Sequence, residues 1–132
     1  MIVVEKGLWN KKDKLELFIK ERPEGNSLLI SRGKVKTTEV EVDTLDNILE
    51  ELEIDRVALV KMDIEGAEIE ALKGMGKTLS NNGTRIVIAA YHIVDGQPTY
   101  KTIIPTMEAI GFRTILDGRK EIAYFDKNVS KG

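Results

Sequence analysis

Two short, almost continuous apolar runs separated by a helical pattern constrain this sequence more than any other feature. The runs Val57–Met62 and Ile86–Ala90 have the length and apolar continuity of strands buried on both faces of a sheet, which predicts strands over residues 57–63 and 85–91. Between them, apolar residues recur at helical spacing and predict a helix over residues 64–79. A strand, a helix and a strand in this order form a right-handed crossover with parallel strands. The chain is therefore expected to have an α/β fold.

The segments on either side of this unit predict further elements. Short apolar or alternating runs over residues 2–4, 14–19, 27–30 and 36–42 favour a meander or hairpin of extended segments. A helix over residues 44–53 follows, which Asp43 or Thr44 would cap. After the crossover, residues 100–110 have helical spacing, and Pro105 is expected to kink or restart that helix. The runs 112–116 and 121–125 predict a carboxy-terminal antiparallel hairpin.

Composition excludes several classes of protein. The length of 132 residues predicts a single domain over residues 1–132. Cysteine is absent, which removes disulfides, thiolate metal sites and cysteine nucleophiles. Residues 37–71 carry a net charge of −10, so nucleic acid is not an expected partner. No run is long and apolar enough for a membrane span, and no secretory signal pattern is present, so a cytoplasmic location is expected.

Polar side chains stand where the two predicted central strands end. Asp63 closes the first strand and His92 follows the second, and ligands of parallel sheets bind outside the carboxyl ends of the strands. If the strands are neighbours, these ends lie about 5 Å apart and both side chains can serve one site. Asp63 would orient a hydroxyl or take its proton, with His92 as base or donor. The structural alternatives are that Asp63 caps the following helix and that His92 is a satisfied core or loop residue.

Glu65 and Glu68 add two acidic groups to the start of the predicted helix. The helix dipole by itself favours acids in a first turn, and this is the structural alternative to a role in a site. Gly66 is expected to permit close backbone approach at the turn from strand to helix. Together with Asp63 and His92, these carboxylates form a weak signal for a divalent cation, and no metal site is predicted.

The residues at this strand end also resemble a known signature. The run Lys61-Met62-Asp63-Ile64-Glu65-Gly66-Ala67-Glu68, followed by Leu72-Lys73-Gly74, is similar to that of the FkbM-type methyltransferases, and Val42-Asp43-Thr44-Leu45-Asp46 resembles the segment before that family's short helix. The resemblance implies a Rossmann-like sheet and S-adenosylmethionine as cofactor. It further implies methyl transfer to a hydroxyl of a small metabolite or sugar, with Asp63, His92, Glu65 and Glu68 as the catalytic candidates.

The resemblance covers the later part of the family's domain. The family's glycine-rich cofactor turn, of the pattern acidic-x-Gly-x-x-x-Gly, has no counterpart in this sequence, and Ala90 stands where the family usually has a carboxylate. Residues 1–8 resemble the third strand of the full fold. We therefore expect an incomplete Rossmann-like sheet, equivalent to the later two thirds of a methyltransferase domain, with cofactor-binding residues unassigned. The alternative function is a non-catalytic binding or assembly module derived from that fold.

The absent strands predict an exposed sheet edge. In related sheets the first strand lies beside the strand equivalent to 57–63, so residues 58–63 are expected to form an unpaired apolar edge. Such edges rarely stay open. Either an early segment, such as residues 2–4 or 15–19, covers this edge, or a second copy pairs with it through a two-fold contact. Self-association, as a homodimer or a larger assembly, is the expected outcome.

Overall fold

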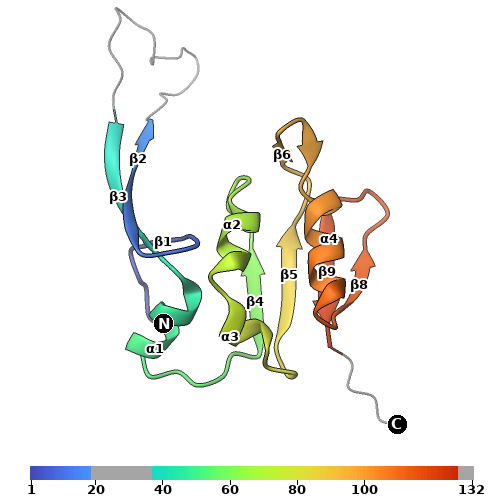
Figure 1. Cartoon of the computed structure of the whole chain (residues 1–132), viewed down its shortest axis with the longest axis horizontal. Coiled ribbons are helices and arrows are strands. Elements are labelled where there is room, and N and C mark those ends of the chain that lie inside the picture. Colours follow the sequence, from blue (N-terminus) through green and yellow to red (C-terminus); the bar gives the residue numbers. More distant parts are fainter. Residues whose placement is uncertain (19–36, 128–132) are drawn as a thin grey trace, which may run out of the picture.

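The computed structural model describes residues 1–18 and 37–127, and a four-stranded sheet is its largest element (Figure 1). The strands are β4 (Leu59–Met62), β5 (Arg85–Ala89), β8 (Arg113–Leu116) and β9 (Ile122–Asp126), in the order β4-β5-β9-β8. Strands β4 and β5 are parallel, with Met62 opposite Ile88, while β9 is antiparallel to both β5 and β8. The predicted parallel pair and carboxy-terminal hairpin are confirmed, and the fold is mixed α/β.

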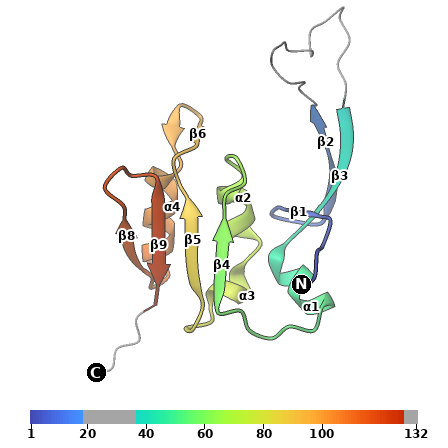
Figure 2. The ribbon, with the colours of Figure 1, turned by 180° about the vertical axis from the view of Figure 1, so that it is seen from behind.

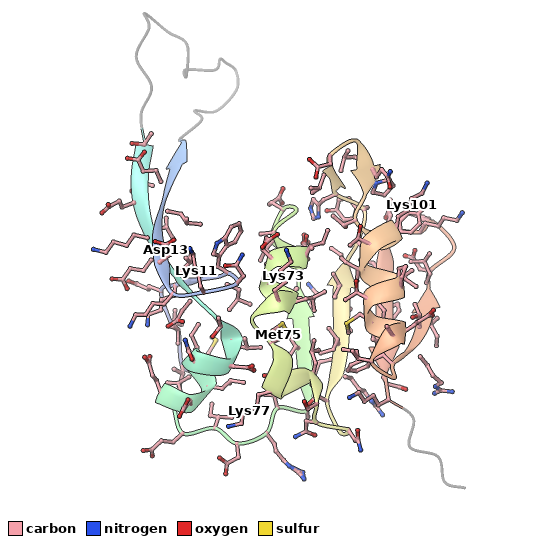
Figure 3. The ribbon with its side chains drawn as sticks, in the orientation of Figure 1. Lys11, Asp13, Lys73, Met75, Lys77 and Lys101 are labelled. Carbon is pink, nitrogen blue, oxygen red and sulfur yellow. The ribbon has the colours of Figure 1, made fainter. Side chains whose placement is uncertain are left out.

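All helices that pack on this sheet lie on one of its faces. These are α2 (Glu68–Lys73), α3 (Gly76–Leu79) and α4 (Tyr100–Ala109), and the reverse view shows the opposite face without a helix in the described part of the chain (Figure 2). Apolar side chains fill the space between helices and sheet, among them Met75 at the junction of α2 and α3 (Figure 3). Burial of such side chains from water is the main force that holds the layers together.

The predicted helix over residues 64–79 is wrong as one continuous element. Residues 63–67 form a turn, in which Glu65 and Gly66 have φ of 57° and 98°, and α2 begins only at Glu68. A second break separates α2 from α3 at Gly74 and Met75. Helical spacing of apolar residues is satisfied on both sides of each break, so periodicity alone does not reveal them.

A second, smaller sheet is formed by the amino-terminal part of the chain. Strand β3 (Thr37–Asp43) lies between β1 (Gly7–Leu8), which is parallel to it, and β2 (Asp13–Phe18), which is antiparallel. Helix α1 (Leu45–Glu51) follows β3 and is capped by Thr44, which confirms the predicted helix and one of its two candidate caps. Residues 27–30, which the sequence predicts as extended, lie outside the described residues.

The predicted strand over residues 2–4 is wrong. No strand is present before β1, and the side chains of Ile2 and Val3 are exposed. Residues 1–8 resemble in sequence the third strand of the full methyltransferase fold. In the structure they contribute only β1, and β1 pairs with β3 rather than with the larger sheet. Short apolar runs carry little information on their partners, because pairing is decided by contacts distant in sequence.

Strand β4 is an edge of the larger sheet, as the sequence predicts. Within residues 1–18 and 37–127 it pairs only with β5, so neither residues 2–4 nor β2 covers it. The side chain of Leu59, at the start of β4, is 56% exposed. An intramolecular repair of this edge by the early segments named above is therefore wrong for the part of the chain that the structure describes.

Two short strands and a helix connect β5 to the final hairpin. Strands β6 (Ile93–Val94) and β7 (Gln97–Pro98) pair antiparallel just beyond the carboxyl end of β5. Helix α4 is a single element with Pro105 inside it, so the predicted restart at Pro105 is wrong. A proline there removes one amide donor without ending the helix. Among the described residues, no helix is both long and apolar enough to cross a membrane.

Candidate functional site

The candidate site lies where β4 and β5 end, beside the β6–β7 hairpin (Figure 1). Asp63 directly follows β4, and His92 lies three residues after β5. Because the two strands are parallel neighbours, these residues meet at one edge, and His92 Nε2 is 3.6 Å from Asp63 Oδ1. The prediction that Asp63 and His92 share one edge of the sheet is confirmed.

The turn after β4 has an unusual backbone that brings acidic side chains toward His92. Glu65 has φ of 57°, a conformation that costs a side-chain-bearing residue about 1 kcal/mol. Gly66 follows with φ of 98°, and a Cβ atom there would lie 3.3 Å from Cγ2 of Val94. Gly66 therefore serves the close backbone approach that the sequence predicts.

Glu68, rather than Asp63, satisfies the amide groups of this turn. Its Oε2 accepts a hydrogen bond from the Ile64 amide at 2.7 Å, and its Oε1 accepts one from the Gly66 amide at 3.0 Å. The helix begins at Glu68, and its N-cap residue Ala67 makes no side-chain cap bond. The alternative in which Asp63 caps the helix is therefore wrong, because the turn moves the helix start five residues beyond Asp63.

Three carboxylates surround the His92 imidazole, and they differ in exposure. Glu68 Oε2 lies 3.5 Å from Nδ1 and its side chain is fully buried. On the other side of the ring, Nε2 lies 3.6 Å from Asp63, which is 45% exposed, and 3.8 Å from Glu65, which is 86% exposed. The structure thus brings together all four candidate residues, and their chemical roles stay predictions.

His92 itself is held firmly, and its two buried ring nitrogens lack hydrogen-bond partners within the described residues. Its carbonyl accepts a hydrogen bond from the Thr99 amide at 2.8 Å, which ties it to the start of α4. The Tyr91 ring stacks on the imidazole with centroids 4.3 Å apart. Within the described residues, neither Nδ1 nor Nε2 has a hydrogen-bond partner, although both atoms are buried. An unsatisfied buried nitrogen is costly, so this arrangement favours a polar ligand or water at the ring.

The electrostatic potential at this edge is negative. The pKa of the Tyr91 hydroxyl is raised, chiefly by the charge of Asp63 and further by partial desolvation and by Glu65, Glu121 and Glu68. A second negative charge beside these carboxylates is unfavourable. The edge therefore suits a neutral hydrogen-bond donor, such as a hydroxyl, better than it suits an anion.

The same residues set limits on metal and cofactor binding. One ligand atom from each of Asp63, Glu68 and His92 lies within 4.8 Å of the others, which is the only such group in the described ranges. Both oxygens of Glu68 already accept amide hydrogens, so its capacity for a cation is reduced. S-adenosylmethionine does not fit the described residues by themselves, because no glycine-rich turn lies beside β4 and β4 is an edge strand. Ala90 is buried in the core and supplies no polar group.

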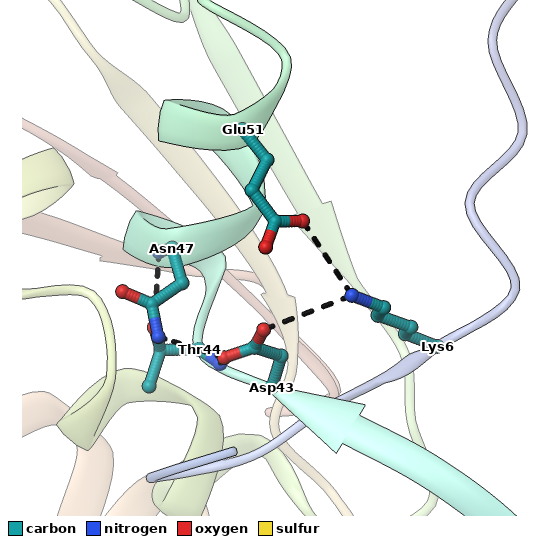
Figure 4. A network of polar contacts seen from close by, with 5 residues as sticks. All are labelled: Lys6, Asp43, Thr44, Asn47 and Glu51. Atoms are coloured by element: carbon teal, nitrogen blue, oxygen red, sulfur yellow. Dashed lines mark hydrogen bonds and ion pairs between the residues drawn. The ribbon is translucent and has the colours of Figure 1, made fainter.

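A polar cluster at the end of β3 was not recognised from the sequence. Asp43 is buried, and its Oδ1 accepts hydrogen bonds from the Thr44 amide and from Asn47 Nδ2, both at 2.8 Å. Lys6 Nζ lies 3.8 Å from Asp43 Oδ2 and 3.5 Å from Glu51 Oε1 (Figure 4). Burial raises the pKa of Asp43, but the hydrogen bonds from Asn47 and Thr44 and the charges of Lys6 and Lys12 outweigh it, so the pKa is lowered.

Two further signature residues connect this cluster to α2 and α3. The Asp46 carboxylate accepts hydrogen bonds from the amides of Lys77 and Thr78, at 2.7 and 2.9 Å, and so caps α3 from a distance of 31 residues in sequence. A Cβ atom on Gly74 would lie 2.5 Å from the Trp9 carbonyl oxygen and 2.7 Å from Thr44 Cγ2. These contacts hold α1 and the segment around Trp9 against α2 and α3. In the sequence, Asp46 and Gly74 are marked only by the resemblance to the family signature.

Comparison with known proteins defines the class of this chain. A profile of the Methyltransferase FkbM domain matches residues 2–114. The chain therefore belongs to the FkbM methyltransferase domain family. The crystal structure of methyltransferase FkbM from Methylobacillus flagellatus is similar to it, with a TM-score of 0.60 and 21% sequence identity. This likeness, which shows a shared fold, covers 91% of this chain and 27% of that chain, so this chain spans about a quarter of that protein. A comparison with curated proteins found no match.

Proposed function

We propose that this chain supplies the acceptor-binding edge of an S-adenosylmethionine-dependent O-methyltransferase, and that the acceptor is a hydroxyl of a small metabolite or sugar. The observation that carries this proposal is Asp63. It follows β4 within the family signature, is 45% exposed, lies 3.6 Å from His92 Nε2 and makes no hydrogen bond within the described residues. A partly exposed carboxylate beside an imidazole is suited to orient a hydroxyl and to accept its hydrogen.

The negative potential of the edge narrows the acceptor to a neutral molecule. Asp63, Glu65 and Glu68 all lie within 3.8 Å of the His92 ring nitrogens, so an anionic acceptor would be repelled. Sugars and polyols present several neutral hydroxyls, and each can donate to Asp63 or to His92. Glu65, at the most exposed position, would contact a second hydroxyl of such a molecule.

S-adenosylmethionine, when bound, supplies a methyl group activated by its sulfonium. The described residues of this chain do not form its binding site, for the reasons given above. The role assigned to the chain's own side chains is therefore limited to the acceptor: Asp63 and His92 receive its hydroxyl, and the β4–β5 strand ends hold these two groups at a fixed separation.

A non-catalytic binding or assembly module is the second candidate. The open edge of β4 and the absence of a glycine-rich turn beside it favour this alternative. In that case the Asp63–His92 edge would retain a polar ligand without transferring a methyl group.

Two experiments separate these functions. Titration calorimetry with S-adenosylmethionine and S-adenosylhomocysteine tests whether the chain binds cofactor, and transfer of a labelled methyl group to a panel of neutral sugars tests catalysis. Methyl transfer by the pure chain would exclude the non-catalytic module. Absence of heat and of transfer would exclude activity of the isolated chain and leave the family membership intact.

Acceptor binding is tested by amide chemical shifts on addition of glucose and, separately, of glucuronate. We expect shifts at the β4 and β5 strand ends with the neutral sugar and weaker ones with the acid. Asp63→Asn should abolish the response, whereas Asp13→Asn, at a carboxylate that is 42% exposed in the other sheet, should not. Equal responses to both sugars would contradict the assignment of a neutral acceptor.

A further inference from the structure

Glu68 differs from the other acidic candidates because it is shut off from solvent. Its side chain is fully buried, and its two oxygens accept the amide hydrogens of Ile64 and Gly66. Acceptance at both oxygens is the bonding pattern of a carboxylate. No molecule bound at the outer edge of the sheet has access to this group, so any influence of Glu68 on a ligand must pass through a neighbouring side chain.

That neighbour is His92, whose two ring nitrogens face carboxylates that differ in their exposure to solvent. Nδ1 is 3.5 Å from the buried Glu68. Nε2 is 3.6 Å from Asp63, which is partly exposed, and 3.8 Å from Glu65, which is almost entirely exposed. Water screens an exposed charge much more than a buried one. The attraction for the single proton of a neutral imidazole is therefore larger on the Nδ1 side.

We propose that Glu68 is a positioning residue that holds the neutral His92 in the tautomer with its proton on Nδ1. The lone pair of Nε2 then faces Asp63 and Glu65, on the side where a bound hydroxyl would donate a hydrogen bond to it. The assignment of the tautomer does not depend on the proposed function. Only the identity of the group that donates a hydrogen bond to Nε2, a hydroxyl of the methyl-accepting substrate, rests on it. Glu68 thus has two roles: its amide bonds build the turn after β4, and its charge sets which nitrogen of His92 is open to a ligand.

The chain offers an unusually clean test, because His92 is its only histidine. Long-range ¹H–¹⁵N correlation spectra of the uniformly labelled chain report which ring nitrogen carries the proton. The spectra are recorded at a pH at which the ¹⁵N shifts of the ring themselves identify it as neutral. We expect protonated Nδ1 and unprotonated Nε2. A wild-type chain with its proton mainly on Nε2 would overturn the proposal.

Variants identify the carboxylate responsible. Glu68→Gln is expected to lower the ratio of the Nδ1–H to the Nε2–H tautomer about tenfold, because it removes the buried charge that attracts the proton to Nδ1. Glu65→Gln is the matched control, and it should leave the Nδ1–H form dominant, because Glu65 is 86% exposed and faces Nε2. A folded Glu68→Gln chain with an unchanged ratio contradicts the proposal.

The test stays decisive if Glu68→Gln does not fold. In that case the wild-type tautomer, together with the Glu65→Gln control, decides by itself. The result is also independent of the proposed function. If the chain shows the Nδ1–H form and binds no sugar, the role of Glu68 is supported and the proposed acceptor is excluded. If it binds the sugar but shows the Nε2–H form, the proposed acceptor is supported and the role of Glu68 is excluded.

Discussion

Two junctions of this protein share one sequence pattern and have different structures. In each, an aspartate stands at the end of a strand and precedes a helix: Asp43 is the last residue of β3, and Asp63 directly follows β4. Asp43 is 1% exposed and accepts two hydrogen bonds, and Thr44 beside it caps α1. Asp63 is 45% exposed, and its helix starts only at Glu68.

The difference teaches how one pattern serves either structure or ligand binding. At β3, which is paired on both sides, the aspartate is buried and its bonds are satisfied within the protein. At β4, which is an edge strand, the turn with positive φ at Glu65 and Gly66 gives the amide-binding role to Glu68. Asp63 is thereby left partly exposed and without a hydrogen bond within the described residues.

The largest expected effect is at Gly74, where the first junction packs on α2 and α3. Gly74→Ala should lower the free energy of unfolding by about 3 kcal/mol, because its Cβ would overlap a backbone oxygen that cannot move away freely. That oxygen, on Trp9, is only 2.5 Å from the Cβ position. Urea unfolding followed by the fluorescence of Trp9, the only tryptophan, measures the effect.

Gly76→Ala is the control for this prediction, because a Cβ atom there meets nothing within 4 Å. Alanine at this position of α3 should change stability by no more than about 1 kcal/mol, and in the stabilising direction. Equal losses at Gly74 and Gly76 would show that helix disruption, rather than the contact with Trp9 and Thr44, explains the result.

The aspartate pair tests the comparison directly. Asp43→Ala should cost about 2 kcal/mol, because it removes a buried carboxylate and leaves the Thr44 amide and the Asn47 side chain without their acceptor in these partly buried hydrogen bonds. Asp63→Ala should change stability by less than about 0.5 kcal/mol, since a partly exposed side chain without hydrogen bonds contributes little. Both are measured by urea unfolding. Similar losses at both positions would remove the distinction drawn here.

The pH dependence of stability gives a smaller effect. Because the folded-state pKa of Asp43 is lowered, the ionised form is stabilised by folding, and its contribution is fully present above the unfolded value of about 3.9. It is lost as the pH falls through the folded pKa. The difference in unfolding free energy between wild type and Asp43→Asn should therefore shrink from pH 6 toward pH 3. A constant difference over that range would argue against an ionised Asp43 in the native state.

The smallest expected effect is on self-association, and it concerns the unpaired edge of β4. We propose that a second copy pairs with this edge, so light scattering at micromolar concentration should give a mass above that of one chain. Leu59→Lys, at the 56% exposed start of β4, should restore the monomer. Ile110→Lys is the matched control, because Ile110 is 46% exposed at the carboxyl end of α4, outside the sheet. A monomeric wild type would end this proposal.

The sequence predicts much of the site because its key relations are local. Apolar runs predict the positions of β4 and β5, although both observed strands are shorter than predicted. The crossover rule makes the strands parallel, and Asp63 and His92 then share one edge. Helix α1 with its Thr44 cap and the final hairpin follow in the same way from residues close in sequence.

Other features are decided by contacts that sequence spacing does not contain. A glycine is required at the end of α2 because Trp9 and Thr44 occupy the space beside Gly74, and α3 begins where Asp46 caps it. Residues 2–4 form no strand, although their composition suits one. In this part of the chain it is the later segment β1 that pairs with β3. Apolar periodicity continues through each of these positions and gives no warning of them.

Sequence by itself therefore determined the class of fold, the family and the position of the site, since these depend on periodicity, chain order and a local signature. Only the tertiary structure decided which acidic residue does which task. Glu68 became the buried partner of the turn and of His92, and Asp63 became the open one. The physical reason is that burial and hydrogen bonding depend on the backbone path through Glu65 and Gly66 and on the β6–β7 hairpin packed against it.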